Sequence, residues 1–230
     1  MPISNKIRYL YQLANFKMRK HVEHPMKEAL TKLTIPYSKY KGAKVIIIHD
    51  IDNIGFEEEM HEMIDLERKK KIKSIIMVLR KTMYYAKIFN VDVGMHETFP
   101  YRFKKNMKIF DNLGVGVKSY SQHVAIKRTN FYPMILNKLP DKIQYMFVDP
   151  VSFGYKTNHV MFYWPKKYKH ITMISIVSEP SKKDIDMVLK EAAKMKGIIA
   201  FNFHPDHFKK GDKYFSKNRE NFEYLLKKLR

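Results

Sequence analysis

Apolar residues along the chain fall into two alternating patterns. Short continuous apolar runs predict buried strands, and between them apolar residues recur every three or four positions, as on one face of a helix. Strands that alternate with helices favour an α/β fold with a parallel sheet, either open or closed into a barrel. The predicted strands are Val45–Ile48, Ser74–Leu79, Val91–His96, Val115–Ser119, Tyr145–Val148, Ile171–Val177 and Ile198–Phe203.

One of the predicted helices carries recognisable ends. It begins with Ser181 and Asp184 in the spacing of a capping box, runs to Lys196, and is followed by Gly197 as its expected stop. The other helices predicted in the second half of the chain are a short one near Pro133–Leu139 and a final one over Asn218–Arg230.

The first 43 residues differ in character from the rest. Residues 1–44 hold ten basic and two acidic side chains, and Ile7, Leu10 and Leu13 can share one helical face. We expect residues 1–43 to form a basic, mostly helical extension packed on or beside the sheet domain of residues 44–230. Such an extension can lie on an anionic membrane surface or cover one end of the domain.

Composition limits the classes of protein and of metal site. The 230 residues, 45% of them apolar, suffice for one domain with a sizeable core, and disorder as the dominant state is excluded. There is no Cys, so neither disulfides nor thiolate metal sites can form. Any metal would be held by His, Asp, Glu or water. The N-terminal residues lack a signal-peptide pattern and no apolar run is long enough to span a bilayer, so we expect a cytoplasmic protein.

The charge is strongly unbalanced, with 44 Lys and Arg against 23 Asp and Glu, a formal net charge of +21. Such a field attracts anionic polymers or anionic membrane surfaces. It is also compatible with a simply Lys-rich solvated surface. No motif of nucleic-acid recognition accompanies it.

Acidic and imidazole side chains follow most of the predicted strands. Sites in parallel α/β sheets and barrels lie at the carboxyl ends of the strands, where the following loops converge. A single His at such a position usually has a structural role, but in this chain most of the strand ends carry His or Asp. These residues are His49, Asp50, Asp52, His96, His123, Asp149 and His204.

Asp50 and Asp52 end the first strand in the sequence V-I-I-I-H-D-I-D. Residues two apart on a strand point the same way, so both carboxylates can face one cavity. A cation would relieve their repulsion. One carboxylate can then bind the metal while the other accepts a proton from water bound to it. A catalytic site of this kind needs about three protein ligands, and we expect Asp52 and His96 to be two of them.

Three stretches resemble the motifs of metal-dependent polysaccharide deacetylases. They are I-I-I-H-D-I-D-N, D-V-G-M-H-E and F-N-F-H-P-D-H-F, in the order and spacing of the branch whose first motif reads His-Asp-x-Asp. The resemblance extends from about Lys44 to the C-terminal residues. It implies a distorted (β/α) barrel, usually of seven strands, and a divalent metal, zinc in the first instance and cobalt or nickel as alternatives.

The resemblance also implies roles for individual residues. Asp50 matches the catalytic base, Asp52 and His96 match metal ligands, and His204 matches the His that protonates the leaving amine. The family's second metal-binding His, four residues after the first, is replaced by Pro100 in this chain.

The third metal ligand must therefore come from elsewhere. We expect it to be His123, with Glu97 as the alternative, and loss of the metal is a further alternative. The family's mid-chain Arg motif is also missing, and Lys127 and Arg128 stand near its place. We predict substrate-binding roles for Arg128, for Asp149 after the fifth strand, and for Trp164, which can stack on a sugar ring or pack in the core.

The leading hypothesis is a hydrolase that removes an acetyl group from an N-acetylated sugar or related amide, with a glycan as partner. A second hypothesis, from another class, is a module that binds nucleic acid or an anionic surface through its charge, with strongly salt-dependent binding. A third is a degenerate deacetylase fold that binds a glycan without cleaving it, for which Pro100 in place of a His is the main argument.

Overall fold

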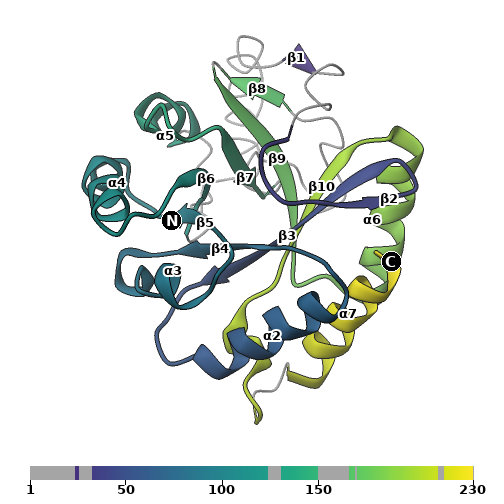
Figure 1. The fold of residues 1–230 in the computed structure, drawn as a ribbon. Coiled ribbons are helices and arrows are strands. Elements are labelled where there is room, and N and C mark those ends of the chain that lie inside the picture. Colours follow the sequence, from purple (N-terminus) through teal and green to yellow (C-terminus); the bar gives the residue numbers. More distant parts are fainter. Residues whose placement is uncertain are drawn as a thin grey trace, which may run out of the picture.

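Seven parallel strands pair in a closed ring, which confirms the predicted barrel (Figure 1). A computed structural model of the chain describes residues 24–25, 33–123, 131–149, 166–168, 170–211 and 215–229. Each of the seven strands pairs with the next of the seven along the chain, and the last pairs with the first. The strands are β3 (Ala43–Ile51), β4 (Ile75–Val78), β5 (Asp92–His96), β6 (Val117–Ser121), β7 (Tyr145–Val148), β9 (Ile171–Ser178) and β10 (Ile198–Asn202).

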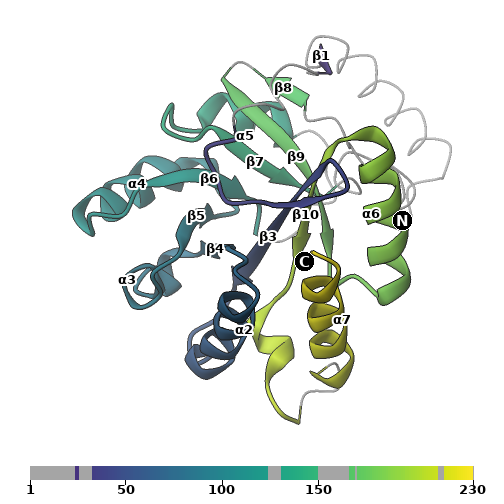
Figure 2. The same cartoon turned by 45° about the vertical axis from the view of Figure 1, so that its right-hand side comes forward.

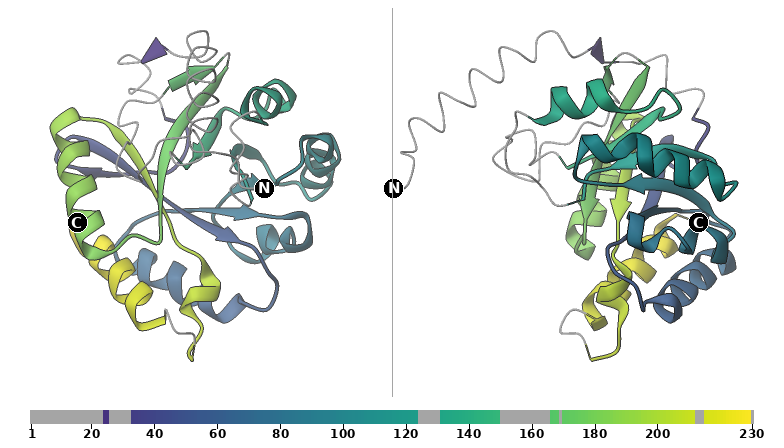
Figure 3. Two further views of the ribbon diagram at one scale, coloured as in Figure 1. Left: turned by 180° about the vertical axis from the view of Figure 1, so that it is seen from behind. Right: turned by 90° about the vertical axis from the view of Figure 1, so that its left-hand side faces the viewer.

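Helices surround the barrel on its outside. In Figures 1 and 2, α2 lies beside α7 and α7 beside α6, and the side view in Figure 3 shows α5, α4, α3 and α2 following one another along the flank. Within the described residues, no helix is both long and apolar enough to cross a membrane. The helices are α2 (Glu57–Lys69), α3 (Tyr85–Ile88), α4 (Phe103–Asn112), α5 (Phe131–Lys138), α6 (Lys182–Met195) and α7 (Phe215–Lys228), with 3₁₀ turns η3 (Arg80–Thr82), η4 (Pro100–Arg102) and η6 (Pro205–Phe208).

The described end of the predicted N-terminal extension is a strand rather than a helix. Strand β2 (Ser38–Tyr40) pairs antiparallel with β3. The connecting Lys41 and Gly42 both have positive φ, at 45° and 89°, as a type I′ hairpin turn requires. The described residues 33–43 thus form no helix, and the mostly helical structure of the extension otherwise stays a prediction. Two short strands, β1 (His24–Pro25) and β8 (Lys166–Tyr168), extend the sheet antiparallel beside β9. The rest of residues 1–32 lies outside the described residues.

Strand β3 divides its side chains between the two faces of the barrel wall. Val45 and Ile47 pack outward against the helices, whereas Ile46 and Ile48 fill the barrel interior. This alternation follows from the two-residue period of a strand. It continues past Ile48, so Asp50 is the next inward-facing residue and reaches the interior where apolar filling gives way to polar groups.

The opposite end of the interior is closed by the chain that precedes β2. Ile35 is buried among the interior residues, with Leu33 and Tyr37 packed beside it. The backbone N–H of Thr34 donates to the Tyr145 hydroxyl at 2.9 Å, which ties this segment to β7. Access to the interior is thereby restricted at the end remote from Asp50.

Most predicted element boundaries differ from the structure by one to three residues. The capping box of α6 is confirmed, since the Ser181 hydroxyl accepts from the Asp184 N–H at 3.2 Å. The helix ends at Met195, one residue before the predicted last residue Lys196, because Lys196 takes the left-handed conformation (φ 50°) and Gly197 N–H donates to Ala192 O. Strand β6 begins at Val117, two residues later than predicted.

Gly94 lies at a position in β5 that has no room for a side chain. A Cβ there would meet Met77 Sδ and lie 2.5 Å from Ser119 Oγ, and the pairing of β5 with β6 shifts register at this residue. Overpacking of this kind costs about 1–3 kcal/mol. Gly94→Ala is therefore expected to lower the urea midpoint, whereas Gly116→Ala, whose Cβ meets nothing within 4 Å, is not. Equal midpoints for the two variants would contradict this packing argument.

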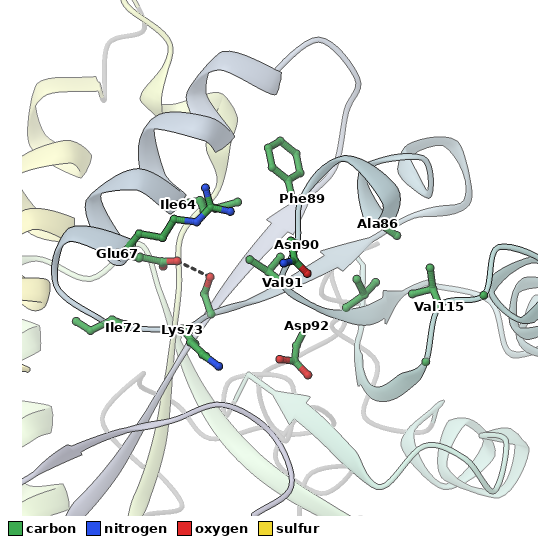
Figure 4. A pocket seen from close by; sticks show the side chains of 15 residues that line it. Ile64, Glu67, Ile72, Lys73, Ala86, Phe89, Asn90, Val91, Asp92 and Val115 are labelled. Carbon is green, nitrogen blue, oxygen red and sulfur yellow. Dashed lines mark hydrogen bonds between the residues drawn. The ribbon is translucent and has the colours of Figure 1, made fainter.

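A hollow of about 570 Å³ lies at the amino ends of β4, β5 and β6 (Figure 4). It is bordered by Lys73, Asp92 and Val115, and the Ser74 hydroxyl donates to Glu67 Oε2 on its wall at 2.6 Å. Because it opens at the opposite end of the strands from Asp50, it is separate from the residues with predicted chemistry.

Candidate functional site

Three side chains from different strand ends converge at the carboxyl end of the barrel. The Asp52 Oδ1 atom lies 3.1 Å from His96 Nε2 and 3.1 Å from His123 Nδ1, and the two ring nitrogens are 3.2 Å apart. Asp52 follows β3, His96 ends β5 and His123 follows β6. We call these three residues the metal cluster. The structure thus brings together all three predicted ligands, although β4 separates the strands that carry Asp52 and His96.

The metal cluster fits a tetrahedral divalent metal in spacing and in donor type. Zinc binds carboxylate oxygen and imidazole nitrogen at about 2.0–2.2 Å, which places ligand atoms of a tetrahedron about 3.3 Å apart. The three separations of 3.1–3.2 Å in the cluster are close to this value. Two imidazoles and one carboxylate also match the ligand set of catalytic zinc sites.

Hydrogen bonds behind His96 leave the correct nitrogen for a metal. His96 Nδ1 lies 2.6 Å from Ser121 Oγ, and the Ser121 hydroxyl donates to Asp50 Oδ1 at 3.2 Å. Because the Ser121 hydroxyl donates to Asp50, the His96 Nδ1–H donates to Ser121 Oγ. In this tautomer His96 Nε2 carries a lone pair on the side of Asp52. Metal-binding His residues are typically oriented by such an outer hydrogen bond.

Asp50 is held inside the barrel by residues from across the ring. Asn202 of β10 donates to Asp50 Oδ2 at 2.7 Å, and Ser121 of β6 reaches Oδ1 from the far side of the interior. Asp50 is buried, with 5% of the residue exposed, and it does not belong to the metal cluster. A buried carboxylate that is positioned by neutral donors and stands beside a cation site is suited to accept a proton.

His204 lies on the other side of Asp50 and is held by Glu179. His204 Nε2 is 3.9 Å from Asp50 Oδ2, while His204 Nδ1 and the His204 backbone N–H lie 2.7 and 2.8 Å from Glu179 Oε1. Glu179 follows β9 and has a left-handed backbone (φ 48°), which is uncommon for Glu and is found at functional sites. Sequence reasoning missed Glu179, although an acidic residue two positions after a predicted strand was the available signal.

Contacts in and around the metal cluster shift the pKa values of Asp52 and His96. Burial would raise the pKa of Asp52, but hydrogen bonds with His123 and His96 outweigh it and hold that pKa far below the ordinary range. Burial would lower the pKa of His96, but the charge of Asp50 and the contact with Asp52 raise it. Both shifts favour the charged forms of Asp52 and His96.

In the Glu179–His204 pair, too, the pKa of the carboxyl group is lowered and the pKa of the imidazole is raised. Burial opposes both charges, but the hydrogen bond with His204 lowers the pKa of Glu179 to about 2. The same bond and the charges of Asp50, Glu179 and Asp52 overcome burial and raise the pKa of His204 to about 9. His204 is therefore protonated at neutral pH, as a proton donor must be.

The Glu179–His204 pair predicts a pH dependence of stability. Because the pKa of His204 is raised from 6.5, its contribution is full below pH 6.5 and is lost as pH rises through about 9. Because the pKa of Glu179 is lowered from 4.5, its contribution is present above pH 4.5 and is lost as pH falls through about 2. Wild type should exceed Glu179→Gln in stability most clearly between these limits, from pH 4.5 to 6.5.

Urea unfolding at several pH values, together with NMR titration of His204, measures this prediction. The His204 pKa is expected to fall in the Glu179→Gln variant. Glu58→Gln removes an exposed carboxylate from α2 and serves as the matched control. A stability difference that does not vary with pH, with an unaltered His204 titration, would show that Glu179 does not hold the proton on His204.

Three further residues differ from their predicted roles. His49 is fully buried but faces outward from the barrel, with Nε2 2.8 Å from Glu67 Oε1 of α2. His207, to which the resemblance assigns no role, lies with Nδ1 3.3 Å from Glu179 Oε1 and borders the site. Glu97, the alternative third ligand, accepts hydrogen bonds from its own loop, at 2.8 Å from the Thr98 N–H and 3.1 Å from the Phe99 N–H.

The remaining predicted residues stand as follows. Pro100, where the family has a second His, is the first residue of η4. Asp149 directly follows β7 at the same end of the barrel and is half-buried, and its substrate-binding role stays a prediction. Arg128 and Trp164 lie outside the described residues.

Comparison with known proteins gives likenesses of structure alone. A scan against protein-family models gives no match, and a search of curated proteins gives none. Among solved structures, the 4-α-glucanotransferase from Thermococcus litoralis is 12% identical with a TM-score of 0.51, over 80% of this chain and 37% of that chain. At such identity the likeness concerns the fold.

Two structures of deacetylases are also similar. The protein described as a polysaccharide deacetylase involved in O-antigen biosynthesis, from Bordetella bronchiseptica, is 14% identical over 83% of this chain and 84% of that chain, with a TM-score of 0.48. The catalytic domain of peptidoglycan N-acetylglucosamine deacetylase from Eubacterium rectale is 10% identical over 85% and 90%, with a TM-score of 0.34. The closed ring of seven parallel strands is a (β/α) barrel, consistent with the fold that the resemblance to polysaccharide deacetylases implies.

Proposed function

We propose that the chain is a metal-dependent hydrolase that removes an acetyl or similar acyl group from an N-acetylated sugar or a related amide. One observation carries the proposal: Asp50, a buried carboxylate outside the metal cluster, lies between that cluster and His204. This arrangement supports the proposal, because metal-dependent amide hydrolysis needs a base beside the metal ligands and a proton donor for the leaving amine.

In this proposal Asp52, His96 and His123 hold a divalent metal, zinc in the first instance and cobalt or nickel as alternatives. When bound, the metal supplies Lewis acidity, which acidifies water and stabilises negative charge developing on the acyl oxygen. Ser121 positions both a proposed metal ligand and the proposed base, because it bonds to His96 and to Asp50.

The chain's own residues move the protons. Asp50 accepts the proton that the attacking water loses, while Asn202 and Ser121 keep its oxygens directed into the site. His204 then donates a proton to the departing amine nitrogen, so that an amine leaves rather than an amide anion. Glu179 orients His204 and keeps it protonated until that step.

Release of acetate from a panel of N-acetylated amino sugars tests the proposal. The wild type should release acetate, a chelator should abolish release, and added zinc or cobalt should restore it. Enzymatic detection of acetate measures the product without depending on the identity of the sugar. Failure of the whole panel under every metal would overturn the proposed hydrolase.

A second candidate function is glycan binding without cleavage on the same fold. Pro100 in place of the second His, and the absence of the family's mid-chain Arg motif from the sequence, favour it. It predicts that glycan binding persists in chelator and that Asp50→Asn changes stability only. Acetate release that depends on metal decides against it.

A further inference from the structure

A groove with three cationic side chains borders the metal cluster. It measures about 470 Å³, and Arg80, Lys81 and Arg102 line it together with Glu97, Phe99 and His123. Sites for small molecules commonly occupy about 300–1,000 Å³. Because His123 belongs both to the groove and to the metal cluster, a molecule in the groove lies beside the proposed reaction centre.

One wall of the groove is fixed to the end of β3. Arg80 and Lys81 belong to η3, and the buried Thr82 in that turn donates from Oγ1 to Ile51 O at 3.0 Å. Lys81 Nζ also donates to Asn53 Oδ1 at 2.7 Å, next to Asp52 in the chain. These contacts hold two exposed cations at the rim of the metal cluster.

The other wall presents Arg102 from the 3₁₀ turn η4. The Arg102 guanidinium lies 4.9 Å from the Phe99 ring centroid and 5.4 Å from that of Tyr101, and the Arg102 side chain is 47% exposed. Stacking on aromatic rings orients a guanidinium and leaves its N–H groups available to an anion.

The single carboxylate of the groove is largely committed to other partners. Glu97 is buried and accepts from two backbone N–H groups and from Asn106 Nδ2 at 2.9 Å. Its distance to Arg102 Nη1 is 3.9 Å, at the outer limit of an ion pair. The groove therefore retains a surplus of positive charge beside the metal cluster.

We infer that the substrate is an anionic N-acylated amino sugar, with a carboxylate, sulfate or phosphate group that sits in this groove while the acyl group faces the metal cluster. The inference rests on the proposed function and names its substrate class. Lys and Arg bind these anions through charge-assisted hydrogen bonds. A neutral sugar would offer no anion to these cations.

Calorimetric binding to the full chain carrying Asp50→Asn tests the inference without turnover. The probes are N-acetylglucosaminuronic acid and N-acetylglucosamine, which differ by a carboxylate in place of a hydroxymethyl group. The acidic sugar should bind more tightly, and added salt should reduce its advantage. Arg102→Gln and Lys81→Gln, each added to this variant, should weaken binding of the acidic sugar about two- to tenfold and leave the affinity for the neutral sugar unchanged.

Lys73→Gln removes the same charge at the opposite end of the barrel and is the matched control (Figure 4). It should change neither affinity. Equal binding of the two sugars, or no binding of the acidic sugar, overturns the inference. So does a loss in Lys73→Gln as large as in Lys81→Gln, because the net charge and not the groove would then attract the anion. Acetate release by the wild type is a separate measurement, so failure of the proposed hydrolysis is distinguishable from failure of this binding preference.

Discussion

Asp50→Asn is expected to lower the rate of acetate release by about 10²–10⁴-fold, the usual effect of losing a general base. The amide keeps the size of the carboxylate and can still accept the hydrogen bond from Asn202 through its oxygen. Its NH₂ group can donate to Ser121 Oγ, which is able to accept. The variant should therefore keep its fold and its metal and lose only the ability to take up a proton.

Circular dichroism, metal analysis and the acetate assay together measure this result. Asp111→Asn is the matched control, because Asp111 is an exposed carboxylate on α4 that pairs with Lys142 at 2.8 Å. It should retain the wild-type rate. An Asp50→Asn variant that turns over at the wild-type rate would remove Asp50 from the chemistry.

Asp52→Ala, His96→Ala and His123→Ala are each expected to reduce bound metal from near one per chain to near zero. Loss of an outer-sphere partner typically costs about 10–100-fold in metal affinity, and loss of a ligand itself should cost more. With only two ligands left, the site cannot retain the three-ligand geometry of a catalytic zinc. Acetate release should fall with the metal.

His123→Ala is the most informative of these variants, because the resemblance to deacetylases supplies no ligand at this position. His170→Ala is the control, since His170 is exposed in a turn before β9. Elemental analysis of each purified variant measures the result. Full metal content in all three cluster variants would mean that the metal binds elsewhere or that the three residues are not its ligands.

The barrel could be predicted from the sequence because its strands are short apolar runs. Tyr145–Val148 was predicted with its observed boundaries, and the alternation that places Asp50 and Asp52 on one side follows from strand geometry. Polar residues at successive strand ends then predicted one site, since parallel strands end on a common face. Sequence periodicity was therefore enough to predict the barrel and the end at which the candidate site lies.

Contacts between distant strand ends were beyond that reasoning. The sequence around Glu179, S-E-P-S, resembles an exposed turn, and only its left-handed backbone and the neighbouring β10 aim its carboxylate at His204. The hairpin at Lys41–Gly42 was also missed, because Lys rarely takes a positive φ. Such features depend on the curvature of the sheet and on the backbone conformation of single residues. Patterns of apolar residues indicate neither.

The pairing of β10 with β3 makes the site a late product of folding. The two strands pair over five residue positions, from Ile198 opposite Lys44 to Asn202 opposite Ile48, across more than 150 residues of chain. Contacts so distant in sequence form slowly, and until β10 arrives the edge of β3 is open to other chains. Asn202, which holds Asp50, arrives with that last strand. Asp50 therefore lacks the hydrogen bond from Asn202 throughout synthesis of the first six strands, and its set of partners is complete only when the ring closes.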